Sequence, residues 1–277
     1  MSLAFARFRR QIAASTGIAF GADKQYLVES RLAPVMRAHG LSDLVELADA
    51  FERGDNQALV REAIDAMTTN ETMFFRDRTP FENFRIQVLP SLMLSKGKER
   101  RLRFWCAACS TGQEAYSLAM ALDQESTALR GWSLEILATD LSTAALDTAR
   151  SGAYSQFEVQ RGLSTSMLLR YFHRENDSWR VNEHMRARVG FRAFNLLSDY
   201  SELGAFDVVF CRNVLMYFEP ETKRSVLARL ADALNHDGYL FLGATESASE
   251  ANACFSQVTP DGVWRVRRRA PPQLRLA

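Results

Sequence analysis

Five short apolar segments, with helical patterns between most of them, constrain the fold more than any other feature of the chain. Their sequences are RLRFWCA, LEILATD, VGFRAFN, FDVVFCRN and GYLFLGA, all after residue 100. β-Branched and aromatic residues are typical of strands, and the helical patterns cover 113–124, 142–150 and 221–234. Strands that alternate with helices form a parallel sheet covered on both faces. We therefore expect an α/β domain with a doubly wound, mostly parallel sheet.

The first part of the chain has a different pattern, because apolar residues recur at helical spacing through residues 5–68. A polar break, TTNETMFFRDRTP, follows this part. We expect a small all-α domain at 1–69 and a larger domain at 70–277. Within the larger domain, WRVNEHMRARVGF predicts a small β-hairpin insertion near 178–193, and VWRVRRR at 263–269 predicts a last strand at the sheet edge.

Composition excludes several classes of protein. The formal net charge of +1 does not suggest a nucleic-acid binder. No apolar run approaches the roughly 20 residues of a membrane-spanning helix, and arginines interrupt the apolar start where a secretory signal has an unbroken apolar block. We expect a cytoplasmic protein with no membrane insertion. Its four cysteines are expected to be reduced, and without a Cys/His cluster at zinc spacing we expect no metal.

The turn after the first predicted strand, CSTGQE, is the first candidate binding site. In an open α/β sheet, ligands bind at the carboxyl ends of the strands, where the strand order reverses. Gly112 supplies the turn, and Asp140 ends the next strand, where an acidic side chain can meet ribose hydroxyls. CSTGQE lacks the G-x-G-x-x-G pattern of dinucleotide sites, and Glu114 would repel phosphates. The turn therefore favours an adenosine ligand with a positive end, such as S-adenosylmethionine (SAM), over NAD or ATP.

The same stretch has a redox interpretation, because WCAAC resembles the WCxxC of thioredoxin-like proteins. In those proteins the first cysteine opens a helix, whose N-terminus lowers the thiol pKa. Here the helix signals begin at Ser110 or Thr111, so Cys106 is expected to lie within the strand. Cys106 and Cys109 are better interpreted as small core residues.

Several segments, in order and with consistent spacing, resemble the chemotaxis receptor protein-glutamate O-methyltransferases, the CheR family. NETMFFRD resembles the family signature N-x-T-x-F-F-R, CSTGQEAYSLAM its C-S-x-G-E-E-P-Y-S turn, and FDVVFCRNVLMYF a later block. The helical start resembles the N-terminal domain of the family, so the resemblance covers nearly the whole chain. It implies a Rossmann-like, class I SAM-dependent methyltransferase domain that esterifies glutamates of methyl-accepting receptors and releases S-adenosylhomocysteine.

The resemblance also implies site residues, position by position. The cofactor would contact Asn70, Thr72, Arg76, Glu114, Asp140, Asn195, Leu196, Arg212 and Asn213. Tyr217 matches the family's tyrosine near the transferring methyl, so Arg76 and Tyr217 are the candidate catalytic residues. The acceptor glutamate would lie on a cytoplasmic receptor helix, held in part by the N-terminal domain through Lys24, Arg31 and Arg37. We expect a monomer that binds no nucleic acid.

The chain departs from the family pattern at three places. Gln113 replaces an acid, Ala115 replaces a proline, and ATES replaces a segment with a histidine before Ser-Glu. These departures leave open a second function: a SAM-binding regulatory module with little or no turnover that recruits a signalling partner. A nucleic-acid methylase is a third hypothesis, but Arg212-Asn213-Val214-Leu215 lacks the prolines of the turn that holds a flipped base.

Each site residue also has an ordinary structural interpretation. Arg76 could bridge the two domains in an ion pair. Asp140 could cap the following helix, and Glu114 could be a first-turn acid favoured by the helix dipole. Asn213 could be a turn residue and Tyr217 a core aromatic. The shared position at the carboxyl ends of predicted strands favours the functional interpretation, because one pocket can collect them.

Overall fold

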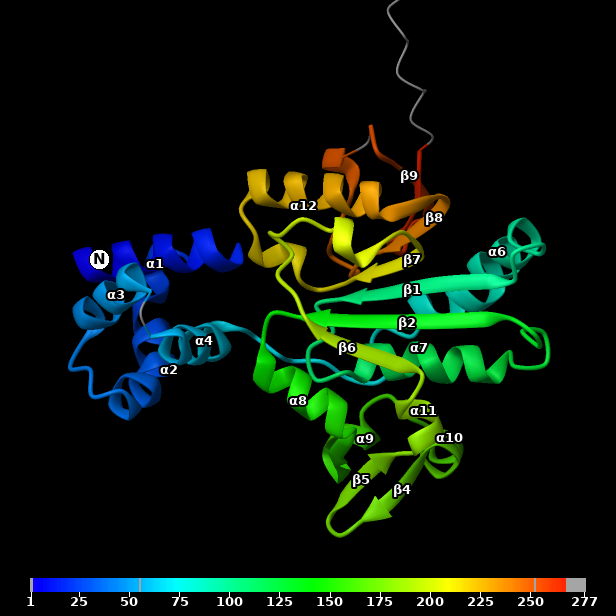
Figure 1. The fold of residues 1–277 in the computed structure, drawn as a ribbon, viewed down its shortest axis with the longest axis horizontal. Coiled ribbons are helices and arrows are strands. Elements are labelled where there is room, and N and C mark those ends of the chain that lie inside the picture. Colours follow the sequence, from blue (N-terminus) through cyan, green and yellow to red (C-terminus); the bar gives the residue numbers. More distant parts are fainter. Residues whose placement is uncertain (1, 55, 252, 268–277) are drawn as a thin grey trace, which may run out of the picture.

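A mostly parallel seven-stranded sheet forms the centre of the larger part of the chain, as the alternating segments predict. The computed structural model describes residues 2–54, 56–251 and 253–267 (Figure 1). In spatial order the strands are β6 (Val189–Ala193), β2 (Ser133–Asp140), β1 (Arg101–Ala107), β7 (Phe206–Cys211), β8 (Leu234–Phe241), β10 (Val263–Val266) and β9 (Phe255–Thr259). The first five are parallel, and β10 pairs antiparallel with both neighbours. The doubly wound α/β fold is confirmed.

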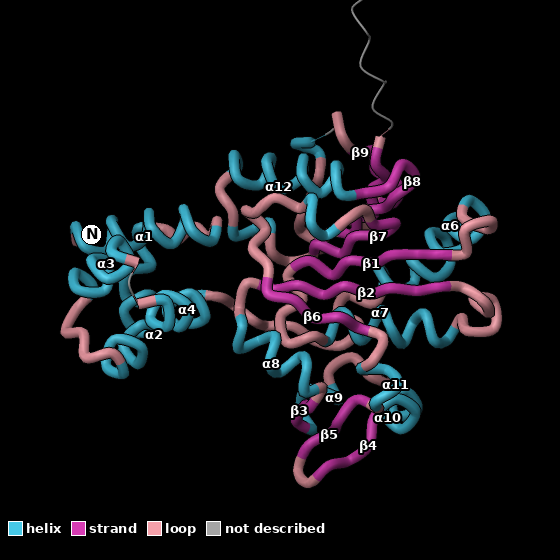
Figure 2. Tube along the Cα trace, viewed as in Figure 1, coloured by secondary structure: helices cyan, strands magenta, loops and turns pink. Residues whose placement is uncertain are grey.

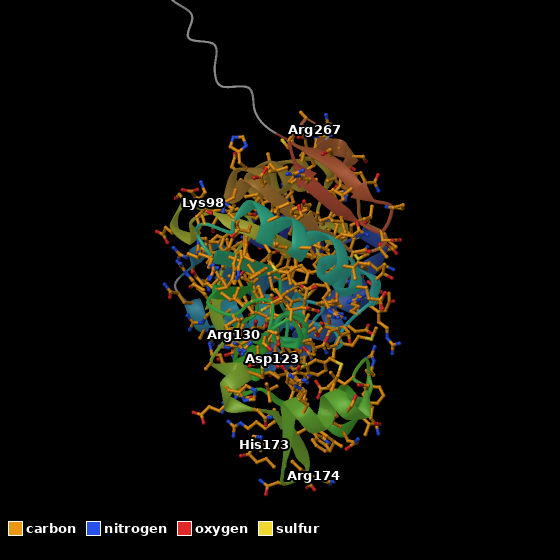
Figure 3. All side chains as sticks on the ribbon, turned by 90° about the vertical axis from the view of Figure 1, so that its right-hand side faces the viewer. Lys98, Asp123, Arg130, His173, Arg174 and Arg267 are labelled. Atoms are coloured by element: carbon orange, nitrogen blue, oxygen red, sulfur yellow. The ribbon has the colours of Figure 1, made fainter. Side chains whose placement is uncertain are left out.

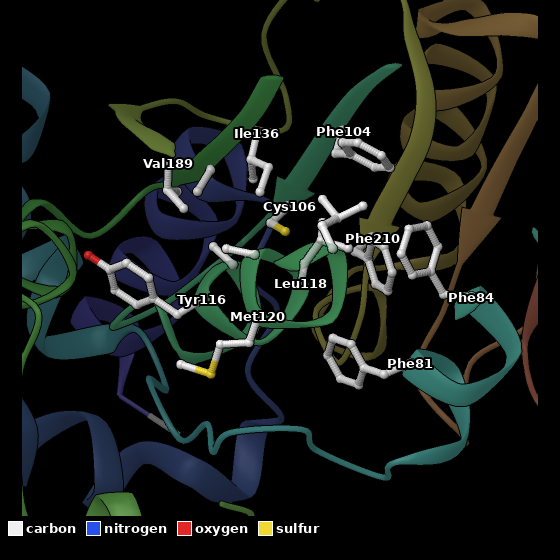
Figure 4. Close-up of a cluster of buried hydrophobic side chains, with 14 of the residues drawn as sticks. Phe81, Phe84, Phe104, Cys106, Tyr116, Leu118, Met120, Ile136, Val189 and Phe210 are labelled. Carbon is white, nitrogen blue, oxygen red and sulfur yellow. The ribbon is translucent and has the colours of Figure 1, made fainter. Parts of the chain in front are cut away.

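Both faces of this sheet are buried, and alternate residues of β1 pack into two different cores. Leu102, Phe104 and Cys106 lie in the core shared with α7 (Gln113–Gln124) and with the segment from α5 to α6; Figure 4 shows part of this cluster. Trp105 and Ala107 face the opposite core, which includes α12 (Pro220–Ala233).

The other helices around the large sheet are α5 (Thr79–Asn83), a π-turn at Phe84–Val88, α6 (Leu89–Ser95) and α8 (Thr143–Ser151).

The N-terminal part is a bundle of helices with its own core. The helices are α1 (Leu3–Thr16), α2 (Gln25–Ala38), α3 (Leu44–Arg53) and α4 (Gln57–Met67), with a 3-10 turn at Ala22–Lys24. Phe5, Phe8, Ile12, Leu32 and Leu47 are buried together. The bundle lies beyond the carboxyl ends of β1 and β2 (Figure 1). It therefore faces the edge of the sheet at which a ligand is expected.

A second, three-stranded sheet corrects the predicted hairpin insertion. It consists of β3 (Ala153–Ser155), β5 (Ser178–Val181) and β4 (Phe172–Glu175), with α9 (Gln156–Gln160), α10 (Thr165–Tyr171) and α11 (Glu183–Arg186) around it. The hairpin is formed by β4 and β5, so the prediction of a hairpin near 178–193 was wrong in its extent. Residues 189–193 are instead strand β6 of the large sheet. Figure 3 shows His173 and Arg174 on this outlying small sheet.

The end of the chain also differs from expectation. The strand predicted from VWRVRRR is β10, but it lies between β8 and β9, so β9 forms the edge. The last part of that prediction, from residue 268 on, lies outside the described residues. Within the residues that the structure describes, no helix is both long enough and apolar enough to span a bilayer.

Candidate active site

A cleft separates the helical bundle from the carboxyl edge of the large sheet, and it is the candidate site. Its volume, open mouth included, is about 1060 Å³. β1 lies between β2 and β7, where the strand order reverses, which is the expected position for a ligand in this architecture. Figure 2 shows the loops that run between the sheet and the bundle.

All ten residues proposed for the cofactor and the chemistry line this one cleft. They are Asn70, Thr72, Arg76, Glu114, Asp140, Asn195, Leu196, Arg212, Asn213 and Tyr217. They come from loops and strand ends that are far apart in the sequence, so the fold brings them together. Their individual roles remain predictions.

The turn between β1 and α7 has a strained backbone where it borders the cleft. Ala108 and Ser110 have φ angles of 62° and 51°, and Gly112 has a φ of 94°. A Cβ on Gly112 would lie 2.8 Å from the Cβ of Ala149 in α8. The close approach that excludes a side chain at Gly112 is therefore to α8. α7 begins at Gln113, as the helical pattern over 113–124 predicts, two to three residues after the helix signals at Ser110 or Thr111.

Asp140 connects the turn after β1 to the turn after β2. Its Oδ2 accepts a hydrogen bond of 2.7 Å from Ser110 N–H, and its Oδ1 accepts one of 2.9 Å from Ser142 N–H. Burial raises the pKa of the Asp140 carboxyl, although these backbone N–H groups offset part of that effect. The cap of α8 is the Ser142 hydroxyl. Asp140 thus supports the turn, and each oxygen has a further lone pair for a ligand.

Glu114 and Arg212 form the charged centre of the cleft. Arg212 Nη1 donates to Glu114 Oε2 at 2.9 Å, and Nη2 donates to Asp77 Oδ2 at 2.6 Å and to the carbonyl of Arg76 at 2.9 Å. Burial raises the pKa of the Glu114 carboxyl, and the charge of Arg212 offsets part of that. Glu114 is therefore more than an ordinary first-turn acid, because it fixes the end of β7 to the start of α7.

The two departures in the turn lie behind the cleft wall. Gln113 is 1% exposed, and its Oε1 accepts a hydrogen bond of 2.8 Å from the Thr111 hydroxyl. A neutral amide at this position avoids the cost of burying another carboxylate beside Glu114. Ala115 is fully buried in the core. Neither residue lines the cleft.

The segment that carries Arg76 lies across the start of α7. Phe75 N–H donates to the Ser117 hydroxyl at 2.9 Å, and Phe75, Asp77 and Arg78 all have positive φ angles. Arg76 Nη1 donates only to the carbonyl of Glu71, at 3.0 Å. No carboxylate in the described part of the chain forms an ion pair with Arg76, so the domain-bridging interpretation is not supported. Strained segments of this kind cluster at functional sites.

The helical bundle supplies part of the wall, which the sequence analysis missed. Thr16 lines the cleft from the end of α1, and Ile18 and Phe20 line it from the segment that follows. Asn195 Nδ2 donates to the carbonyl of Ser15 at 2.6 Å, so its amide holds the bundle against the sheet. The Ser-Thr-Gly sequence at 15–17 signalled only a helix end, and no local pattern indicates which surface it meets.

The loop after β7 carries Asn213 and Tyr217 to the cleft. Asn213 has a φ of 59°, which asparagine tolerates better than most residues. Glu246 was not selected from the sequence, although it is part of the noted ATES departure. It is 8% exposed, and its carboxylate accepts hydrogen bonds from the N–H groups of Asn213 and Met216. The available signal was an acid two residues after the predicted strand GYLFLGA.

The cysteines do not support the redox interpretation. Cys106 lies within β1, as expected, and Cys106 and Cys109 are both buried and free. Burial raises the pKa of both thiols well above the usual value. A reactive cysteine needs a lowered pKa and access, so these two side chains act as core residues.

The three basic residues proposed for receptor binding do not line the cleft. Lys24 and Arg37 are exposed on the bundle, where Lys24 pairs with its neighbour Asp23 at 3.2 Å. Arg31 Nη1 donates to the carbonyls of Met67 and Thr68 at 3.3 and 3.4 Å, at the end of α4. Arg31 thus has a structural contact, while Lys24 and Arg37 are available to a partner.

The residues of the cleft fit SAM. The carboxylates of Glu114 and Asp140 suit a ligand with an ammonium group and ribose hydroxyls. Apolar side chains, among them Leu141, Phe194 and Leu196, line the same cleft and suit an adenine ring. The doubly wound sheet and this acidic, partly apolar cleft at its switch point define the class of the protein as a SAM-dependent methyltransferase.

Comparisons with known proteins agree with this class and narrow it. The family model described as "CheR methyltransferase, SAM binding domain" matches residues 70–263, and "CheR methyltransferase, all-alpha domain" matches residues 3–68. The chain belongs to the CheR methyltransferase family, and its cofactor is SAM.

Curated relatives match over nearly the whole chain. Chemotaxis protein methyltransferase 1 of Pseudomonas aeruginosa is 45% identical over 271 residues, which are 95% of this chain and 97% of that protein. Chemotaxis protein methyltransferase Cher2 of Pseudomonas putida is 43% identical and covers 89% and 90% of the two chains. Chemotaxis protein methyltransferase 1 of Vibrio cholerae is 41% identical and covers 91% of each. These names do not favour the alternative of a module without turnover.

Proposed function

We propose that this protein transfers the methyl group of SAM to glutamate side chains of chemoreceptors, and that it acts in chemotaxis. The products would be glutamate methyl esters and S-adenosylhomocysteine. The observation that carries the proposal is one cleft lined both by the carboxylates of Glu114 and Asp140 and by Arg76, which forms no ion pair in the described chain. Such a cleft suits a cationic donor and an anionic acceptor together. The names of the relatives support the pathway.

The acceptor needs little chemical activation. A glutamate side chain has an ordinary pKa of about 4.3, so it is ionised at neutral pH and can act as a nucleophile without a general base. SAM, when bound, supplies a methyl group activated by a positively charged sulfonium. No histidine is among the described residues that line the cleft. The task of the chain is therefore to hold the reacting atoms in line, about 3–3.5 Å apart.

Arg76 and Tyr217 are the groups that we assign to this positioning. The Arg76 guanidinium can hold a carboxylate by a charge-assisted hydrogen bond. The Tyr217 hydroxyl makes no hydrogen bond to the described chain, so it can donate to one acceptor oxygen while the other reacts. Glu114, Asp140 and their neighbours on the sheet side would hold the cofactor.

The receptor would contact the N-terminal bundle. We propose residues 1–69 as the receptor-recognition domain and 70–277 as the methyltransferase domain, with Lys24 and Arg37 facing an acidic partner and Arg31 adding its charge while it also contacts the end of α4. The bundle forms one wall of the cleft through Ile18 and Phe20, so a helix held by it would lie near the site. We further propose that the protein acts as a monomer in the cytoplasm, where receptor helices are accessible.

The test is methyl transfer to a purified receptor cytoplasmic fragment with methyl-labelled SAM. We expect base-labile label on glutamates and none when those glutamates are replaced by glutamine. Arg76→Ala and Tyr217→Phe should lower kcat/KM by about 10- to 1000-fold, because orientation contributes several kcal/mol to the rate. Tight SAM binding with no ester on any receptor fragment would refute the proposed substrate.

A further inference from the structure

The carboxylate of Glu246 gathers three backbone N–H groups from two neighbouring loops. Its Oε2 accepts hydrogen bonds from Asn213 N–H at 2.7 Å and from Gly243 N–H at 2.8 Å, and its Oε1 accepts one from Met216 N–H at 3.2 Å. Asn213 and Met216 follow β7, whereas Gly243 follows β8. Glu246 therefore joins the ends of two adjacent parallel strands.

The hydrogen bonds of Glu246 leave no room for a side chain at position 243. A Cβ on Gly243 would lie 2.8 Å from Glu246 Oε2 and 3.0 Å from Asn213 N, so only glycine allows the approach. Glu246 is 8% exposed and forms no ion pair within the described chain. A buried carboxylate without a counter-charge is costly unless hydrogen bonds stabilise it. Here the hydrogen bonds come from backbone N–H groups. The carboxylate is therefore stabilised only when the loop backbone has this conformation.

The same loop is also held by the segment that follows α1. Ala19 N–H donates to the carbonyl of Tyr217 at 2.8 Å, and Ile18 forms an isolated β-bridge with Phe218. The strained Asn213 begins the loop and Tyr217 ends it. The Tyr217 hydroxyl has no partner in the described chain, so the backbone of residues 213–217 sets the position of its ring.

We propose that Glu246 is a positioning residue for Tyr217. Glu246 does not line the cleft, and both of its oxygens accept backbone hydrogen bonds, so it acts through the loop and not on the reactants. The proposal rests on the proposed function, because Tyr217 is assigned there to the acceptor. It predicts a loss of turnover, with a much smaller effect on donor binding, when the carboxylate is removed.

Glu246→Gln is the most informative variant. Glutamine keeps one acceptor oxygen, but its amide N–H₂ would face a backbone N–H donor of the loop. Glu250→Gln is the matched control, because Glu250 lies four residues further on, is exposed, and pairs with Lys223 at 3.1 Å. Both variants change one carboxylate to an amide in the same region.

The experiment combines ¹⁹F NMR and kinetics. The protein is labelled with 3-fluorotyrosine at its seven tyrosines, and the Tyr217 resonance is assigned with Tyr217→Phe. In Glu246→Gln we expect this resonance to shift or broaden while the others stay in place. We expect kcat for the receptor fragment to fall by about 10- to 100-fold, as for a misplaced positioning group, and the Kd for SAM to change by less than about threefold. Glu250→Gln should match the wild type.

Each outcome decides the proposal. An unchanged Tyr217 resonance with unchanged kcat in Glu246→Gln overturns it. If Glu246→Gln does not fold, Glu246→Asp is measured in the same way. A loss of chemical-shift dispersion at all tyrosines in both variants also overturns the proposal, because the role of Glu246 would then be structural. If the wild type makes no methyl ester, the proposed function fails, but the Tyr217 resonance and the Kd for SAM still decide whether Glu246 positions Tyr217.

Discussion

Arg212 donates a hydrogen bond of 2.9 Å from Nη1 to Oε2 of Glu114, across 98 residues of sequence. The Arg212 side chain is 1% exposed and that of Glu114 is 12% exposed, so the ion pair is largely shielded from water. The second nitrogen of the guanidinium holds Asp77 and the carbonyl of Arg76. One side chain therefore connects the sheet, the first turn of α7 and the loop that carries a candidate catalytic residue.

Arg212→Met should lower the free energy of unfolding by about 3 kcal/mol, because it leaves Glu114 buried without its counter-charge. Urea unfolding followed by tryptophan fluorescence measures this. Adding Glu114→Gln should restore part of the loss, since it removes the unpaired charge. Arg224→Met is the control, because Arg224 forms an exposed pair with Glu221 and should cost less than about 1 kcal/mol. Equal losses in the two arginine variants would contradict the assignment.

Asp140→Asn should weaken SAM binding by about 10- to 100-fold, the effect of losing a hydrogen bond to a charged group. The amide would also place an N–H donor against the backbone N–H of Ser110 or Ser142. Isothermal titration with SAM and S-adenosylhomocysteine measures the change. Asp147→Asn is the matched control on the exposed face of α8, where Asp147 pairs with Arg150 at 2.9 Å. Unaltered affinity in Asp140→Asn would remove Asp140 from the cofactor site.

SAM affinity should fall as the pH is lowered. The fall should begin at a pH above the ordinary pKa range of carboxyl groups. Burial raises the pKa of Glu114 and of Asp140 above their usual 4.5 and 3.8. Each carboxyl therefore becomes neutral at a higher pH than in the unfolded chain, and a neutral carboxyl no longer attracts a cationic ligand. Titrations at decreasing pH measure this, and Asp140→Asn should show a shallower dependence. Constant affinity down to the usual Glu value would contradict it.

The effect of these two groups on folding has the opposite sign. A carboxyl with a raised pKa binds more protons in the folded state than in the unfolded state between the two pKa values. Its contribution to the free energy of unfolding therefore increases as the pH falls through that window. Donor binding and stability should thus diverge on mild acidification. A parallel decline of both would indicate unfolding and not titration of the cleft.

Gly112→Ala should destabilise the protein more than Gly54→Ala, although both glycines have positive φ angles of 94° and 64°. A left-handed backbone costs an alanine about 1–2 kcal/mol at either position. At Gly112 the new Cβ would also lie 2.8 Å from Ala149, whereas nothing lies within 4 Å of it at Gly54. We expect an additional loss of about 1–3 kcal/mol from that overlap. Similar unfolding curves for the two variants would show that the α8 contact adjusts freely.

The sequence predicted those parts of the fold that local patterns determine. The predicted helix at 113–124 has the observed bounds, because its apolar spacing and its glycine are neighbours in the sequence. The hairpin near 178–193 failed because Ser178–Val181 and Val189–Ala193 look alike locally. Val189–Ala193 pairs with β2, far back in the chain and in the large sheet, whereas Ser178–Val181 pairs with the adjacent β4 and with β3 in the small sheet. Pairing of that kind is not visible in local alternation.

The residues of the candidate site also fall into two groups, those that local sequence indicates and those that depend on distant contacts. Asp140 could be selected because it ends a predicted strand, and Arg76 and Asn213 because they lie in segments that resemble family blocks. Ile18 could not, because it reaches the cleft only through the docking of the bundle and the bridge to Phe218. Glu246 acts through the backbone of another loop, and its partners depend on how two strand ends meet.

Reversing the charge of Lys24 and Arg37 together should raise KM for the receptor fragment by about 5- to 50-fold. Rim charges steer an oppositely charged partner and set the salt dependence of its binding. Both side chains are exposed and do not line the cleft, so the Kd for SAM should stay the same. Initial rates at several salt concentrations measure KM. As the salt concentration increases, the wild type should lose affinity for the receptor fragment faster than Lys24→Glu/Arg37→Glu. Lys98→Glu/Arg224→Glu is the control, because both residues are exposed, lie outside the bundle and give the same change in net charge. If it raises KM equally, the bundle is not the receptor surface.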